Sequence, residues 1–219
     1  MLTSRGTRRG RLRDDGFTLL EVTFATLILG IMLAIAAGGL ISLQNLTARN
    51  NAMITVEQNA STTLAQMARD IRSSHSITFL PSTTNAAYSV VLYINQPAGG
   101  TLPVEWVYQP PTAPATVGTL SRVVLTQSLA VSASNVVLSD VANGANPVFS
   151  YFNLNGGSSM PTSGSTALQT LQNCTTAIGV NLTISPAPVP GVSVFTESDQ
   201  VAITDQQQLL SAPGDHQCG

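Results

Sequence analysis

One carboxylate stands inside an apolar stretch near the start of the chain. Residues 17–43 carry a single charged side chain, Glu21. An ionisable group in such a stretch is costly and needs a partner. Cleavage between Gly16 and Phe17 would supply one, because the new α-amino group of Phe17 is cationic near neutral pH and lies about one helical turn from Glu21. The amine of one molecule can then meet Glu21 of its neighbour when the two pack together.

Glu21 also has simpler interpretations. A carboxylate in the first turn of a helix is favoured by the positive end of the helix dipole. The alternative to a functional role is an acid that only reaches toward the headgroups of a membrane. Intramembrane acids are functional more often than not, so we expect Glu21 to act in assembly.

The apolar stretch itself is long enough to cross a bilayer. The stretch 17–43 is longer than the ~20 residues that a spanning helix needs. Arginines stand before it at positions 5, 8, 9, 11 and 13. Positive charge is retained on the cytoplasmic side, so the rest of the chain is expected outside. A secretory signal peptide has a shorter apolar core of roughly 7–15 residues, and an ordinary single-span anchor does not explain the position of Glu21.

A family motif begins at the proposed cleavage site. The prepilin cleavage and methylation motif of type IV pilins and type II secretion pseudopilins is similar to the string Gly16-Phe17-Thr18-Leu19-Leu20-Glu21-Val22. The resemblance implies that residues 1–16 are a cytoplasmic leader, which a membrane-bound prepilin peptidase removes by cutting after Gly16. It also implies N-methylation of Phe17 by the same enzyme. A residue without a side chain, such as Gly16, enters a peptidase groove most easily.

The helical pattern continues beyond the apolar stretch. Proline is absent from residue 17 until Pro81, and apolar residues recur at three- and four-residue steps. These residues are Leu46, Met53, Val56, Ala60, Leu64, Met67, Ala68 and Ile71. The pattern predicts one helix from 17 to about 74, roughly 85 Å long at about 1.5 Å per residue. We expect residues 17–43 to form its transmembrane and filament-core half, and residues 44–75 to form an amphipathic half that lies on a sheet.

Small residues repeat every four positions in the apolar half, at Gly30, Ala34 and Gly38. Such a face lets helices approach closely in lipid and predicts a role in subunit assembly. The glycines have other interpretations. One alternative is that they only weaken the helix, since glycine costs about 1 kcal/mol relative to alanine. The other is that Gly38 and Gly39 mark a place where the helix loosens on entering a filament.

The remaining chain, residues 76–219, reads as β structure. Short apolar runs alternate with breaks rich in Pro, Gly and Ser. The predicted strands are 88–94, 102–109, 120–127, 136–141, 148–154, 178–185 and 200–204. The predicted breaks are 95–100, 110–118, 155–166 and 186–191. Together with the long helix these elements predict an α+β protein, in which one long helix packs on an antiparallel sheet, as the resemblance to pilins also implies.

A second, more local resemblance concerns this β-rich region. J-type minor pseudopilins and related minor pilins contain, in the same order, segments similar to residues 68–72, 104–108, 120–122 and 148–152. Their sequences here are Ala-Arg-Asp-Ile-Arg, Val-Glu-Trp-Val-Tyr, Leu-Ser-Arg and Val-Phe-Ser-Tyr-Phe. The similarity implies a minor subunit of a filament.

Two cysteines, Cys174 and Cys218, are the only ones in the chain. In an exported protein such a pair predicts a disulfide, and two free buried thiols are the alternative. A loop of about 45 residues would be closed, which is worth about 4 kcal/mol in the chain-entropy model. Many type IV pilins likewise have a disulfide-bounded C-terminal region.

Chemistry of other kinds finds little support in the sequence. The chain has no CxxC pair, HExxH helix, phosphate-binding glycine loop or GxSxG elbow, so we expect neither an enzyme nor a cofactor. A loose acidic set, Glu197, Asp199 and Asp205, is a weak candidate for Ca²⁺. Without closer ligand spacing, solvated loop acids are the simpler interpretation. We therefore expect no metal.

Charge limits the partners of the mature protein. Charged residues make up only 9% of the chain, and the net charge is −2. Removal of residues 1–16 takes away five arginines, Asp14 and Asp15, which leaves four arginines against nine acids, or −5. Such a chain has little attraction for phosphate backbones, so no nucleic acid is expected.

These observations predict a structural subunit, a minor pilin or pseudopilin of a type IV pilus or a type II secretion-like filament. It would sit in the inner membrane with a cytoplasmic N-terminus, and then in a periplasmic or extracellular filament beside other pilin subunits. A filament-tip subunit for adhesion or DNA uptake is the alternative, and an anchored exported enzyme is a third hypothesis that the absence of a reactive constellation disfavours.

Overall fold

The computed structural model describes residues 18–80, 85–153, 162–185 and 195–203. It divides into two compact units, Met1–Ala48 and Arg49–Gly219. Helix α1, Leu19–Arg72, begins in the first unit and ends in the second. Every described side chain up to Asn51 is exposed, so no described residue of this chain covers the apolar half of α1. The prediction of one continuous helix is confirmed, and it begins after Thr18.

The second unit is built around the last turns of α1. Ala60, Leu64, Met67, Ala68 and Ile71 are buried, and Val56 packs against them. These are six of the eight residues of the predicted apolar stripe. The other two, Leu46 and Met53, are exposed. Burial therefore begins later along the helix than the periodicity suggested, at the point where the sheet starts to cover α1.

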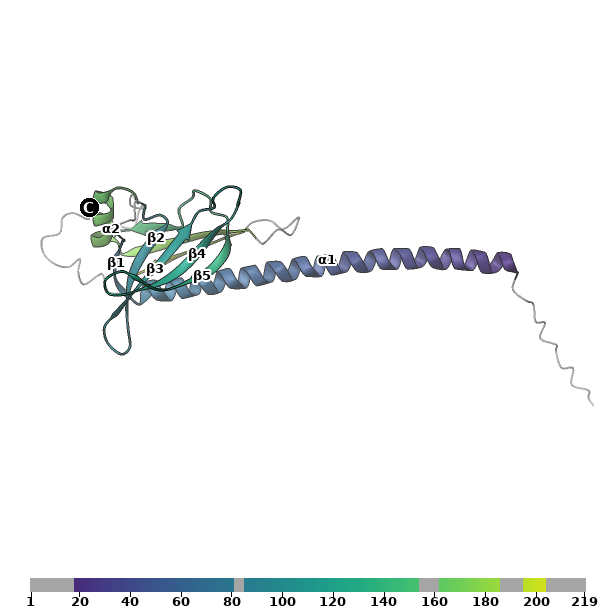
Figure 1. Ribbon diagram of the computed structural model, residues 1–219, viewed down its shortest axis with the longest axis horizontal. Helices are drawn as coiled ribbons and strands as arrows, with labels where there is room; N and C mark the ends of the chain where they lie inside the picture. The colour runs from purple at the N-terminus through teal and green to yellow at the C-terminus, as the bar shows by residue number, and fades with distance from the viewer. Residues whose placement is uncertain (1–17, 81–84, 154–161, 186–194, 204–219) are drawn as a thin grey trace, which may run out of the picture. The chain divides into compact units, whose positions relative to one another are not determined.

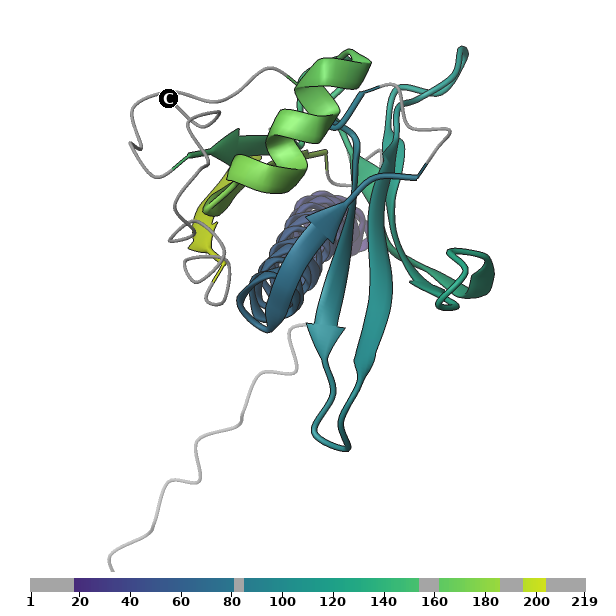
Figure 2. The ribbon, with the colours of Figure 1, turned by 90° about the vertical axis from the view of Figure 1, so that its left-hand side faces the viewer.

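Eight strands among the described residues form one antiparallel sheet. They are β1 Ser74–Thr78, β2 Ser89–Asn95, β3 Thr101–Gln109, β4 Gly118–Leu125, β5 Val131–Val141, β6 Phe149–Phe152, β7 Ala177–Ile184 and β8 Phe195–Ala202. Their order is β1-β2-β3-β4-β5-β7-β6, and β8 pairs with β7. Figure 2 shows the end of α1 between β1–β5 on one side and β8 on the other. The chain is thus an α+β protein with a long helix on an antiparallel sheet, as predicted (Figure 1).

Two elements escaped the sequence-based prediction. Strand β1 contains Ser74 and His75, which we had assigned to the helical segment 44–75. The helix ends earlier because two serines bond back to it: Ser73 Oγ donates to the Arg69 carbonyl at 2.8 Å, and Ser74 Oγ donates to the Ile71 carbonyl at 2.6 Å. These bonds satisfy carbonyls that the helix leaves open at its end. The chain then pairs with β2.

Helix α2, Ser165–Cys174, is the other missed element. Its first residues fall in the predicted break 155–166, where Ser and Gly dominate the sequence. Leu171 and Cys174 are buried and Leu168 packs against the core, at the three-residue spacing of a helix. The element is too short for this spacing to stand out in the sequence. Strand β8 also begins five residues before the predicted strand 200–204.

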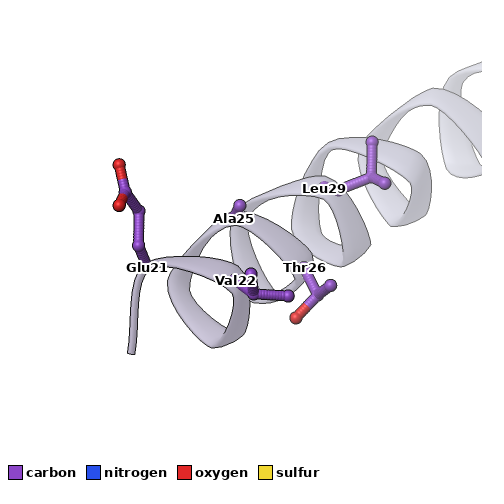
Figure 3. A pocket seen from close by; sticks show the side chains of 5 residues that line it. All are labelled: Glu21, Val22, Ala25, Thr26 and Leu29. Carbon is purple, nitrogen blue, oxygen red and sulfur yellow. The ribbon is translucent and has the colours of Figure 1, made fainter. Parts of the chain in front are cut away.

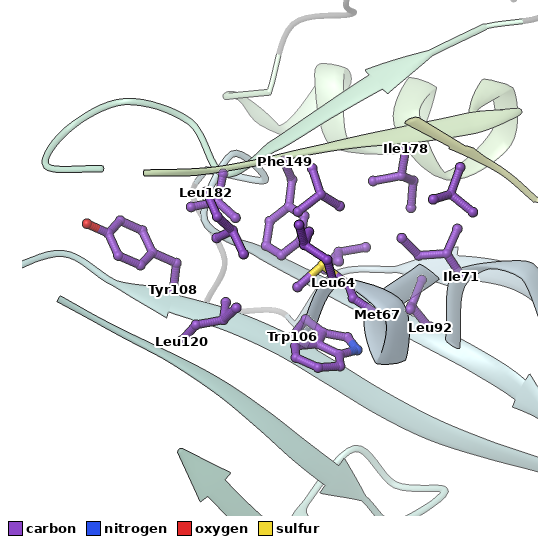
Figure 4. Packing of buried hydrophobic residues seen from close by; sticks show 14 of the residues in the cluster. Leu64, Met67, Ile71, Leu92, Trp106, Tyr108, Leu120, Phe149, Ile178 and Leu182 are labelled. Carbon is purple, nitrogen blue, oxygen red and sulfur yellow. The ribbon is translucent and has the colours of Figure 1, made fainter. Parts of the chain in front are cut away.

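The main core lies between α1 and the concave side of the sheet. Figure 4 shows Leu64 and Met67 of α1 with Trp106 on one side and Phe149 on the other. Tyr151 is also fully buried, and its hydroxyl donates to the Ala86 carbonyl at 2.8 Å. Burial raises the pKa of the Tyr151 phenol well above its ordinary value, so the ring stays neutral inside the folded domain.

A polar contact fixes α1 against the sheet within this core. Asp70 Oδ2 accepts from Trp106 Nε1 at 3.1 Å and from Arg122 Nε at 2.8 Å. Trp106 and Arg122 are direct cross-strand partners on β3 and β4. The side chains of Asp70 and Arg122 are 13% and 22% exposed. Asp70 is not part of the predicted apolar stripe, yet it faces the sheet and bonds to two strands at once.

The sheet is nearly interrupted between β5 and β7. Their register joins only Val141 and Ile184. Beside this contact, the side-chain amide of Asn143 takes the place of a strand: its Nδ2 donates to the Asn181 carbonyl at 2.9 Å, and its Oδ1 accepts from the Thr183 N–H at 2.7 Å. Asn143 is 2% exposed, so it supplies partners that water cannot.

Candidate functional site: the N-terminus of helix α1

The N-terminus of α1 is capped by its own sequence. Thr18 precedes the first helical residue, and its Oγ1 accepts from the Glu21 N–H at 3.3 Å. The Thr18 carbonyl also accepts from the N–H groups of Glu21 and Val22, at 3.0 and 3.2 Å. Thr18 and Glu21 have the spacing of a capping box, in which threonine at the cap is followed three residues later by glutamate. This spacing is visible in the sequence, and our prediction had not used it.

The Glu21 carboxylate projects away from the helix (Figure 3). No described residue donates a hydrogen bond to it or pairs with its charge. The Glu21 carboxylate borders an open hollow of about 410 Å³ on the helix surface. The hollow is lined by Glu21, Val22, Ala25, Thr26 and Leu29. Ala25 and Leu29 follow Glu21 at four-residue steps, so the small Ala25 leaves a depression between two larger side chains. A side chain of another helix can enter such a depression.

The predicted assembly residues Gly30, Ala34 and Gly38 have open space beside them in this structure. A Cβ added at Gly30 or Gly38 would meet no atom within 4 Å, and Ala34 is exposed. Packing within the described chain therefore does not explain why these residues are small. The proposed cleavage residues, Gly16 and Phe17, lie outside the described residues.

One described helix is long and apolar enough to span a membrane. It is α1, whose most apolar window has a mean hydropathy of 2.4, and none of that window is buried. This property is consistent with a membrane-anchored protein before assembly.

Comparison with known protein families adds one match. Residues 11–37 match the model of the prokaryotic N-terminal methylation motif. The chain carries a prepilin-type cleavage and methylation motif on a pilin-like fold. Pilin-like proteins with this motif are processed at it and assemble into filaments, and they are typically structural subunits rather than enzymes. The comparison with curated proteins found no match.

The other residues singled out in the sequence lie far along this pilin-like chain. Cys174 is buried at the end of α2, while Cys218 lies outside the described residues, so their pairing stays a prediction. Glu197 and Asp199 lie on β8, and Asp205 is outside the described residues. Within the described part of the chain, no group of three His, Cys, Asp or Glu side chains could hold a metal ion.

Proposed function

We propose that this protein is a minor pilin or pseudopilin, a subunit of a type IV pilus or a type II secretion-like filament. The observation that carries the proposal is the start of α1: a capped helix with Glu21 in its first turn, followed by a fully exposed apolar surface. Exposed apolar area of this extent needs a cover, first lipid and then other helices.

Processing would prepare this helix for assembly. A prepilin peptidase cuts after Gly16 and methylates the new N-terminus at Phe17. The cationic amine then lies near the helix start, where Glu21 has no partner among the described residues. In the filament, the amine of one subunit pairs with Glu21 of the next, and the small face of Gly30, Ala34 and Gly38 allows close packing. The domain that follows stays on the periplasmic or extracellular side.

A minor, J-type role is the finer part of the proposal. Three of the four segments that resemble J-type pseudopilins meet in one contact, since Asp70, Trp106 and Arg122 come from residues 68–72, 104–108 and 120–122. Each of these segments is short and common when taken alone. Because three of them form one interaction together, they support the resemblance more strongly than they do separately.

Glu21 gives the test of the proposed assembly. Glu21→Ala should still be inserted and cleaved, because removal of a charge from an apolar segment lowers the cost of insertion. Its incorporation into filaments beside wild-type subunits should fall by at least about tenfold, the equivalent of ~1.4 kcal/mol. The measurement is the amount of tagged subunit in purified filaments relative to the membrane fraction.

Glu57→Ala is the matched control for Glu21→Ala. Glu57 is an exposed acid on the same helix, outside the apolar half, and its replacement should leave incorporation unchanged. Normal incorporation of the Glu21→Ala subunit would contradict the pairing of amine and carboxylate.

We further propose that Cys174 and Cys218 form a structural disulfide in the exported protein. Replacement of both by serine should lower the thermal midpoint of a chain truncated before Leu46, because closure of a loop of about 45 residues is worth about 4 kcal/mol in the chain-entropy model. Mass spectrometry of the secreted protein under non-reducing conditions should find no free thiol. Two alkylated thiols would contradict the bond and weaken the assignment of this domain to an oxidising compartment.

A further inference from the structure

A groove lies between the last turns of α1 and strand β8. Its volume is about 470 Å³, within the range of ~300–1,000 Å³ that is typical of ligand pockets. Leu64, Ala65 and Ala68 of α1 give it an apolar floor, and the two alanines let another chain approach the helix closely. The other lining residues are Ser61, Arg69, Arg72, Glu197, Ser198 and Asp199.

The groove gathers charge in a domain that has little of it. Outside the Asp70–Arg122 pair, the described residues from 49 onward carry eight charged side chains, and four of these line the groove. The two arginines are three residues apart on α1, and the two acids are two residues apart on β8, so each pair lies on one face of its element. Among the described residues, no ion pair joins Arg69 to either acid. The groove therefore has a cationic side and an anionic side.

Both acids point to the core side of β8. Glu197 and Asp199 lie directly opposite Leu182 and Val180 of β7, whose side chains belong to the main core. Directly opposed residues point to one face of a sheet. Val201, two residues further along β8, is 2% exposed on this face. The two carboxylates thus face the groove, and no described residue bonds to either of them.

Strand β8 also has a free backbone edge. In the described part of the chain it pairs with β7 alone. The backbone of Thr183 on β7 faces the opposite way, because its N–H donates to Asn143 Oδ1 and its C=O accepts from the Ala142 N–H. Its partner on β8, Thr196, therefore turns its own N–H and C=O away from β7. The same holds at two-residue steps along β8, for Ser198, Gln200 and Ala202.

We propose that this groove binds an extended segment of a different polypeptide, which adds a strand to the free edge of β8. The segment bonds to the backbone of Ser198 and Gln200. It places an acidic side chain at the arginines of α1 and a basic side chain at the two acids of β8. A second copy of β8 is a poor occupant, because like charges would meet. The proposal concerns the globular domain and does not rest on the filament role proposed above.

Photo-crosslinking in cells that export the full chain tests this groove. A benzoylphenylalanine replaces Ser61, an exposed lining residue of α1, and mass spectrometry identifies the segment that it captures. Illumination should give an adduct with one segment of another protein that carries both an acid and a base. Arg69→Glu should lower the yield about tenfold, because it opposes two carboxylates. Arg49→Glu, the same change at an exposed arginine of α1 outside the groove, should leave the yield unchanged.

Gln200→Pro tests the strand pairing separately. Proline lacks the N–H that Gln200 turns to the free edge, while the residues on either side keep their bonds to β7. The proline variant should lower the yield, and Gln200→Ala should not. If the proline unfolds the domain, Asp199→Lys, which reverses a charge on the other side of the groove, decides in its place.

Three results would overturn the proposal. One is an adduct that joins Ser61 only to the chain's own residues 204–219 or to a second copy of the chain. Another is a yield that Arg69→Glu leaves as high as in the unchanged chain, because the charges of the groove then select nothing. The third is the absence of any adduct.

Discussion

Replacement of Gly16 by valine should leave the protein uncleaved. The side chain of valine blocks the close fit of the chain at the bond to be cut, and a displacement of about 1 Å at a reacting group can cost ~100-fold in rate. The uncut chain keeps five arginines ahead of the apolar helix and has no free amine beside Glu21. It should therefore stay in the membrane and be absent from filaments.

The measurement is the intact mass and N-terminal sequence of the protein from membrane and filament fractions. The wild-type chain should begin at Phe17, with a methyl group on its nitrogen. Gly10→Val is the matched control, because it makes the same change in the leader away from the cut, and its processing should be normal. A mature start well beyond Leu43 would contradict the pilin-like reading, since the apolar segment would then be a removed signal peptide.

Replacement of Asp70 by alanine should destabilise the globular domain by about 2–3 kcal/mol. The loss leaves the Arg122 guanidinium and the Trp106 N–H without their partner in a largely buried place, and unpaired groups of this kind are expensive. Trp106 is the only tryptophan in the chain. Its emission should therefore report the change directly, and urea unfolding of a chain truncated before Leu46 gives the free energy.

Two further variants separate charge from packing at Asp70. Asp70→Asn keeps an oxygen that can accept from Trp106 Nε1 but removes the ion pair with Arg122, so its cost should be smaller. Removal of both charges in Asp70→Ala with Arg122→Leu should cost less than the sum of the single changes. Glu57→Ala, an exposed acid on the same helix, should be neutral. An Asp70→Ala domain as stable as the wild type would show that the contact contributes nothing.

The helix and most strands could be predicted because their patterns are long. The apolar run, the absence of proline and the stripe from Val56 to Ile71 specify α1, and period-two alternation specifies β7, where Val180, Leu182 and Ile184 are buried and Asn181 is exposed. Strand β1 and helix α2 were missed because five and ten residues give too few repeats for a pattern, and long-range contacts decide their conformation.

Polar contacts were harder to predict than burial. Asp70 looks like any solvated acid of an amphipathic helix, and only the fold brings Trp106 and Arg122 to it from two strands. Asn143 is likewise recognisable only once β5 and β7 are in place. At the candidate site the signal is local, because Thr18 and Glu21 interact within one turn. Their spacing in the sequence would have been enough to predict the contact, although our prediction did not use it.

The side-chain amide of Asn143 is also open to slow deamidation. Gly144 follows Asn143. Because glycine has no side chain, the backbone nitrogen of Gly144 is unshielded and can attack the carbon of the Asn143 side-chain amide. That attack releases ammonia, and hydrolysis of the cyclic imide leaves an acid. The bonds to Asn181 and Thr183 hold the amide and must break first. An acid there would turn an oxygen, not an N–H, toward the Asn181 carbonyl, so an aged copy would lose this one bond, while the backbone bond from the Ala142 N–H to the Thr183 carbonyl would still join the two segments.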